Sequence, residues 1–130
     1  MVKIVTSLGN QQCEACDLNA SKVGNEELQI LLGKIPNWHI KNIDNIMQLE
    51  RCFNFANFAQ AMDFSNKVAR IAEIEAHHPS IHIEWGQVKI NWWTHKIKGL
   101  HKNDFIMAAK TEAFYETKDN KNFLSSKNNS

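Results

Sequence analysis

The chain has 130 residues, of which 43% are hydrophobic and 22% charged, and its formal net charge is +1. This size and mixture predict one globular domain that buries most of its apolar surface. The near-zero charge argues against a broad basic surface for nucleic acid or anionic lipid, and no apolar run approaches the ~20 residues of a membrane span. The first residues, MVKIVTSLGNQQ, lack the apolar stretch of a signal peptide, so we expect a cytoplasmic protein.

Residues 1–23 are mixed in composition and weakly patterned, and we expect them to form a flexible N-terminal arm. The arm contains Cys13 and Cys16 as a C-x-x-C pair, whereas Cys52 stands alone. A tetrahedral zinc site usually needs two such pairs, and a redox pair usually follows a strand of a βαβ unit. Reduced thiols are therefore the favoured interpretation, and a metal or redox role stays open.

A helix is predicted from about Asn25, because acidic residues in its first turn precede a run of leucine and isoleucine. Gly33 and Pro36 are expected to end it. Two short strands follow over residues 37–42 and 46–53, separated by the turn-like stretch NIDN.

The period of the apolar residues changes at Asn54, which we expect to cap a long helix. Two neighbouring apolar stripes follow at helical spacing: Phe55, Phe58, Met62, Ala69 and Ala72, and beside them Ala61, Phe64, Val68 and Ile71. So wide an apolar face predicts a well-buried helix. Pro79 disfavours a helical backbone at His78. The helix should therefore end around Ala76 or His77.

Two alternating strands are predicted over residues 80–85 and 87–93, joined by a tight turn at Gly86. After a loop, a last helix is expected from about Lys102 through Tyr115. Its inward-facing residues are expected to be Phe105, Ile106, Ala109 and Ala113.

The predicted order of elements is α-β-β-α-β-β-α within one domain, residues 24–117, and the polar residues 118–130 are expected to form a disordered tail. Hairpin connections favour a four-stranded antiparallel sheet with the helices packed on one face. The predicted fold class is therefore α+β, a single-domain sandwich.

Histidine is concentrated in one segment, because residues 72–95 hold four of the six histidines in the chain. A catalytic metal needs three ligands that converge on one centre. His77 and His78 are adjacent and would normally diverge, although Glu73 and Glu75 lie close by in the sequence. A metal site is possible here but is not signalled.

Proton transfer is the second interpretation, because imidazole titrates nearest neutral pH and can both give and take a proton. Such a site would combine His77, His78 and His95 with a carboxylate that orients one ring, and Asp104 could serve. Packing is the third interpretation, since an isolated histidine is most often a surface or packing residue. We assign His39, His82 and His101 to that class.

An ordered set of motifs runs through this part of the chain: Glu73, then His77-His78-Pro79, Thr94-His95, Gly99-Leu100 and Asp104. Together with the predicted order of elements, this set resembles the pterin-4a-carbinolamine dehydratase family over residues 26–116. The resemblance implies removal of water from 4a-hydroxytetrahydropterin to give quinonoid dihydropterin, which recycles the cofactor of aromatic amino acid hydroxylases. It implies no metal and no cofactor, a pterin substrate, and a homodimer or homotetramer.

The resemblance also implies roles for individual residues. His77 and His95 would handle protons near the hydroxyl-bearing carbon, and His78 would bind and orient the pterin. The supporting positions would be Glu73, Pro79, Thr94 and Asp104.

The chain departs from the family pattern at Ala76, where an acidic residue is frequent, and at Ile81, where an aromatic residue is frequent. A wall of the pterin site would then come from Trp92 or Trp93. His101 stands at a helix start that is often Ser or Thr, which suggests a missing cap. Two alternatives to catalysis stay open: a protein that only binds pterin, and a dimerisation cofactor like the vertebrate members, which act on a homeodomain transcription factor.

Overall fold

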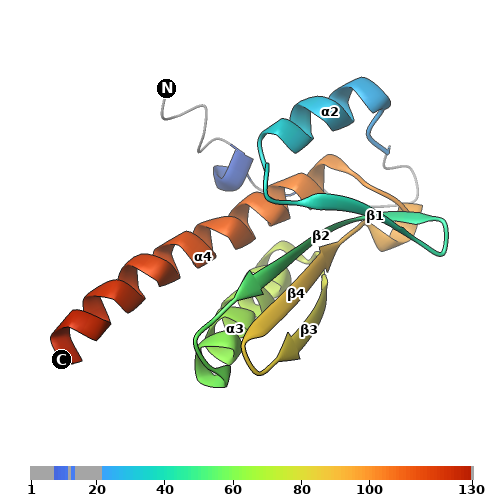
Figure 1. Cartoon of the computed structure of the whole chain (residues 1–130). Helices are drawn as coiled ribbons and strands as arrows, with labels where there is room; N and C mark the ends of the chain where they lie inside the picture. Colours follow the sequence, from blue (N-terminus) through green and yellow to red (C-terminus); the bar gives the residue numbers. More distant parts are fainter. Residues whose placement is uncertain (1–7, 12, 14–21, 130) are drawn as a thin grey trace.

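The computed structural model describes residues 8–11, 13 and 22–129, with side chains described as far as residue 117. Its strands form one antiparallel sheet in the order β1-β2-β4-β3 (Figure 1). The strands are β1 His39–Ile43, β2 Ile46–Asn54, β3 Ser80–Glu84 and β4 Gln87–Trp92, and the helices are α2 Asn25–Gly33, α3 Phe58–Glu75 and α4 Lys102–Asn129. α3 and α4 pack on the sheet and α2 packs on α4, so the predicted α+β sandwich is confirmed.

One face of the sheet forms the core with α3 and α4. Phe53 of β2 packs on Phe64 of α3 with ring centroids 4.7 Å apart. Trp92 of β4 donates from Nε1 to Thr111 Oγ1 of α4 at 3.2 Å. Burial of the sheet residues on this face is complete for Leu49, Phe53, Val88, Ile90 and Trp92. Their apolar area removed from water is the main stabilising contribution to the fold.

The opposite face, here called the outer face, carries mostly polar side chains. Strand alternation places on it Gln48, Glu50 and Cys52 of β2, Lys89 and Asn91 of β4, and Ser80, His82 and Glu84 of β3. This is the pattern of an antiparallel sheet with one covered face.

The long helix begins later than predicted. Asn54 is the last residue of β2 and pairs with Gln87, and Asn57 is the N-cap, whose side chain accepts from the Gln60 N–H at 2.8 Å. The prediction was wrong because Phe55 is apolar and lies at helical spacing from the apolar residues of α3, although it is not part of that helix. Its N–H continues the strand contacts by donating to the Gly86 carbonyl at 2.8 Å, while its ring is buried.

Both predicted hairpin turns are confirmed. At the β3–β4 turn a Cβ on Gly86 would lie only 2.9 Å from the Phe55 carbonyl oxygen, so a side chain is excluded there. In the β1–β2 turn, Asp44 and Asn45 have φ values of 54° and 67°. This left-handed conformation suits Asn and Asp and fits a two-residue hairpin turn.

The last helix differs from its prediction in length and in one buried position. α4 continues through residues 118–129 to Asn129, past the end expected at Tyr115. That stretch has no Pro or Gly to stop a helix. Ala113 is exposed rather than inward, because Thr111 is the buried residue of that turn.

The described part of the N-terminal arm packs on the domain. Leu8 is buried in the core, the Gly9 carbonyl accepts from Lys110 Nζ at 2.9 Å, and the Cys13 N–H donates to Glu75 Oε1 at 2.9 Å. Cys16, and with it the C-x-x-C pair, lies outside the described residues. No helix within the described residues is long and apolar enough to cross a membrane.

Candidate active site

The paired histidines lie just beyond the C-terminus of α3, as the position of Pro79 predicts. Ala76 ends the helix in the left-handed conformation with φ 54° and ψ 41°, and the His77 N–H then donates to the Ala72 carbonyl at 3.0 Å. This turn separates the two rings. His77 is 6% exposed, whereas the His78 side chain is 58% exposed.

Asp104, in the first turn of α4, is the buried centre of the site. Its Oδ1 accepts from His77 Nε2 at 2.7 Å. Its Oδ2 accepts from Thr94 Oγ1 at 2.8 Å and from the His101 N–H at 2.9 Å. Charge-assisted hydrogen bonds of this kind are the stronger ones, so Asp104 joins the end of α3, the end of β4 and the start of α4.

The cap that seemed missing at the start of α4 is provided by His101 itself. Its Nδ1 accepts from the Asn103 N–H at 3.0 Å, while Asp104 accepts from the His101 N–H. The arrangement resembles a capping box, except that the imidazole accepts from the second helical residue rather than the third. The sequence did not indicate this role, because the side chains that usually cap a helix start are Ser, Thr, Asp and Asn.

His95 begins the 3-10 turn η1 (His95–Ile97) and lies beside the paired histidines. Its Nε2 lies 3.3 Å from the His78 carbonyl oxygen. A carbonyl oxygen only accepts, so Nε2 carries the proton and Nδ1 is the acceptor of the neutral ring. The turn is fixed by the bridge between Thr94 and Gly99, with N–H to carbonyl distances of 2.8 and 3.4 Å.

The two tryptophans after β4 lie against different histidines. The Trp92 ring is fully buried and stacks on His77 at 5.8 Å. The half-buried Trp93 ring stacks on His95 with centroids 4.4 Å apart and an interplanar angle of 27°. Trp92 and Trp93 were the two residues expected to form a wall of the pterin site, and of these Trp93 lies beside an exposed histidine.

The two glutamates at the end of α3 have different partners. Glu73 Oε2 lies 2.6 Å from His78 Nε2, and both side chains are exposed. Glu75 instead accepts from the Cys13 N–H. Among the described residues, no three His, Cys, Asp or Glu side chains are grouped so that they could hold a metal ion.

The remaining histidines lie elsewhere in the fold. His82 is exposed on β3, with Nε2 3.1 Å from Glu84 Oε2, and His39 is exposed at the start of β1. The structure thus brings together His77, His78, His95, Thr94 and Asp104, with Glu73 and Pro79 adjacent.

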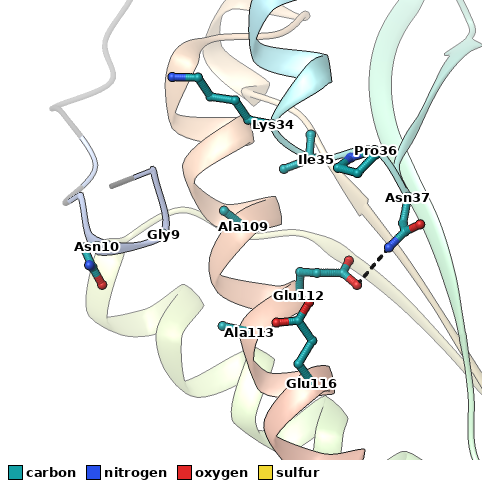
Figure 2. Close-up of a pocket in the computed structure, with 10 residues that line it drawn as sticks. All are labelled: Gly9, Asn10, Lys34, Ile35, Pro36, Asn37, Ala109, Glu112, Ala113 and Glu116. Carbon is teal, nitrogen blue, oxygen red and sulfur yellow. Dashed lines mark hydrogen bonds between the residues drawn. The ribbon is translucent and has the colours of Figure 1, made fainter. Parts of the chain in front are cut away.

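Two pockets formed by described residues lie away from these histidines. The larger, about 360 Å³, lies between Gly9–Asn10, the 34–37 loop and α4 (Figure 2). The smaller, about 240 Å³, is lined by residues around Lys22 and Lys98.

In the larger pocket, Glu112 is held by Arg51, whose Nε and Nη2 donate at 2.8 and 2.9 Å. Burial works to lower the pKa of Arg51, but the hydrogen bond and charge of Glu112 outweigh it and raise that pKa above its ordinary value. Glu112 also accepts from Asn37, as Figure 2 shows, and from Trp38. These contacts hold the start of β1 on α4.

Comparison with known proteins identifies the family. A model of the pterin 4 alpha carbinolamine dehydratase family matches residues 21–114. The chain belongs to this family. The resemblance inferred from His77-His78-Pro79, Thr94-His95 and Asp104 is thereby confirmed.

Solved structures related to the pterin carbinolamine dehydratases share this fold. The transcriptional coactivator/pterin dehydratase from Brucella melitensis is 26% identical, with a TM-score of 0.66, and the match covers 73% of this chain and 99% of that one. A pterin dehydratase-like protein that is a RuBisCO assembly factor in the alpha-carboxysome is 21% identical, with a TM-score of 0.52, and the match covers 61% and 89%. At that identity, the second likeness concerns the fold alone.

Proposed function

We propose that this protein is a pterin-4a-carbinolamine dehydratase that removes water from 4a-hydroxytetrahydropterin by histidine acid–base catalysis. The observation that carries the proposal is that two exposed histidines, His78 and His95, are joined by the 3.3 Å contact from the His95 ring to the His78 carbonyl, next to a buried His77–Asp104 pair. Membership of the dehydratase family supports it. The reaction recycles the cofactor of aromatic amino acid hydroxylases.

The dehydration requires two proton transfers on one ring. The carbon–oxygen bond at C4a breaks, and the oxygen leaves as water after receiving a proton. A ring nitrogen loses its proton, and the electron pair of that N–H bond forms the new carbon–nitrogen double bond. A pair of imidazoles near neutral pH can give one proton and take the other.

Burial favours His78 and His95 as the residues that exchange protons with the substrate. This differs from the division first drawn from the family resemblance, which assigned the protons to His77 and His95. The His77 ring is 6% exposed, and its Nε2 is bound to Asp104. We therefore assign His77 a positioning role, in which it fixes the turn that presents His78.

A non-catalytic role is the alternative, because the similar Brucella melitensis protein is a transcriptional coactivator as well as a pterin dehydratase. Turnover separates the two roles. Stopped-flow dehydration of synthetic 4a-hydroxytetrahydropterin should be faster in the presence of the protein, in proportion to protein concentration. A protein that saturates with pterin but leaves the rate unchanged would be a binding or dimerisation module.

Assembly and location belong to the same proposal. We expect a homodimer or homotetramer, and the exposed apolar side chains Phe58, Ile74 and Trp85, at 48%, 72% and 69% exposure, are candidates for burial between copies. The cytoplasm is the expected location.

A further inference from the structure

Three polar side chains on the outer face are hydrogen-bonded to one another and have no part in the histidine site described above. Asn91 Nδ2 donates to Gln48 Oε1 at 2.9 Å and to Glu50 Oε2 at 3.2 Å. Although they lie on the face opposite α3 and α4, Gln48 is only 6% exposed and Asn91 only 5%. We call these three residues the outer-face triad.

The contacts fix which atoms the triad presents. The Glu50 carboxylate only accepts, so the Asn91 atom facing it is the amide nitrogen and Asn91 Oδ1 is left as an acceptor. The same nitrogen faces Gln48, which therefore turns Oε1 inward and leaves Nε2 as a donor. Glu50 Oε1 is a second acceptor. Among the described residues, no hydrogen bond is made by these three atoms. Each of them therefore keeps some solvent-accessible surface, because no buried side-chain atom in the described part of the chain lacks a partner.

Sheet register places the triad beside the strand ends that lead to the exposed histidines. Asn91 pairs with Glu50 on one side and with Ser80 on the other. Alternation along β4 puts Trp93 on the same face as Asn91, about 6.6 Å further on. His95 stacks on Trp93, and His78 precedes Ser80 by two residues. Because strands lie about 4.8 Å apart, Glu50 and Ser80 are about 10 Å apart across Asn91, which is on the order of the length of a bicyclic ring lying over Asn91.

We propose that the outer-face triad recognises the 2-amino-4-oxopyrimidine edge of the substrate, an inference that rests on the proposed function. That edge offers two donors, the 2-amino group and the adjacent ring N–H, and one acceptor, the 4-oxo oxygen. The triad offers two acceptors and one donor. Glu50 and Asn91 take the two donors, Gln48 donates to the oxo oxygen, and the reacting carbon then lies on the side of His78 and His95.

If the triad recognises this edge, the protein should bind a 2-amino-4-oxopteridine more tightly than a 2,4-dioxopteridine. A 2,4-dioxopteridine replaces the 2-amino donor by an oxygen, which would face the Glu50 carboxylate and leave it unpaired. When the dioxo ring binds, the Glu50 carboxylate loses a hydrogen bond to a donor and is left without a partner. Because a hydrogen bond to a charged group is among the stronger ones, we expect the dioxo ring to bind at least tenfold more weakly than the amino ring.

The test measures, by fluorescence titration, the dissociation constants of 2-amino-4-oxopteridine and 2,4-dioxopteridine. Wild type is compared with Glu50→Gln and with the control Glu84→Gln, which removes an exposed carboxylate from the same face. Wild type and Glu84→Gln should prefer the amino ring at least tenfold, and Glu50→Gln should reduce that preference to about threefold or less. Thermal melts confirm that each variant folds.

The possible outcomes distinguish a failure of this inference from a failure of the proposed dehydratase function. The inference is overturned if wild type accelerates dehydration and binds the amino ring, but Glu50→Gln keeps the full preference for the amino ring over the dioxo ring. In that case the triad does not recognise the pyrimidine edge. If wild type neither binds the amino ring nor accelerates dehydration, the proposed function fails, and the inference fails with it.

Discussion

At the scale of single residues, the site divides into a buried pair and an exposed pair. His77 and Asp104 form a buried hydrogen bond of 2.7 Å. His78 and His95 are exposed and meet through a 3.3 Å contact to the His78 carbonyl. Replacing a histidine of one pair should therefore have a different consequence from replacing one of the other.

His77→Ala should lower both stability and turnover, because it leaves the buried Asp104 carboxylate without one partner. The expected loss in free energy of unfolding is roughly 1–3 kcal/mol. His78→Ala, at an exposed position, should cost less than about 0.5 kcal/mol of stability while lowering turnover. Urea unfolding combined with steady-state kinetics checks both. Equal stability of the two variants would contradict the positioning role of His77.

The motif residues were predictable from the sequence, and their division into pairs was not. The spacing of His77-His78-Pro79 indicated where α3 ends, and Asp104 was expected to orient an imidazole. Which ring it orients depends on how the chain leaves α3 at Ala76, whose backbone is left-handed. Sequence periodicity carries no information on that single residue.

At the scale of elements, the ends of helices were the least predictable features. The α3 stripe was recognised, but its start was placed at Asn54 because Phe55 is apolar and lies in phase with the helix. β2 continues through Asn54 by pairing with β4. The capping role of His101 was missed for a related reason, since ring nitrogens can accept from a backbone N–H only when the ring turns back onto the helix.

The revised start of α3 predicts an asymmetry between two asparagines. Asn57→Ala removes the side-chain acceptor for the Gln60 N–H and should cost about 1 kcal/mol of unfolding free energy. Asn54→Ala removes no cap and should cost less than about half of that. The measurement is urea unfolding of both variants. A larger loss for Asn54→Ala would restore the earlier start of the helix.

At the scale of the whole molecule, the antiparallel pairing of the strands and the one-sided helix packing followed from the hairpin connections and the order of elements. The packing of the first described residues did not, because Leu8 is one apolar residue in a weakly patterned stretch. It is 2% exposed and contributes to the core. The boundaries of arm, domain and tail remain predictions.

Leu8→Ala should therefore lower stability without abolishing turnover. A buried leucine truncated to alanine costs about 2–5 kcal/mol, while the histidine site lies elsewhere and keeps its contacts. Thermal melts and dehydration kinetics below the melting temperature check this. An unchanged melting temperature would show that Leu8 is not part of the core in solution.

The expected homo-oligomer is tested by sedimentation velocity. A species of two or four times 15.0 kDa is expected at micromolar concentration. Replacing the exposed Ile74 by Lys should shift the distribution towards the monomer, because a charge would have to be buried between copies. A single 15 kDa species in the wild type would contradict the assembly.

The most direct test of the account is stopped-flow dehydration of 4a-hydroxytetrahydropterin by wild type, His95→Ala, His78→Ala and the control His82→Ala. A positioned acid or base typically contributes ~10²–10⁴-fold, and the observed loss will be smaller because this carbinolamine also dehydrates without enzyme. His95→Ala and His78→Ala should lose most of the protein-dependent rate, and His82→Ala should retain it. Loss of turnover in His82→Ala, with His95→Ala unaffected, would contradict the site.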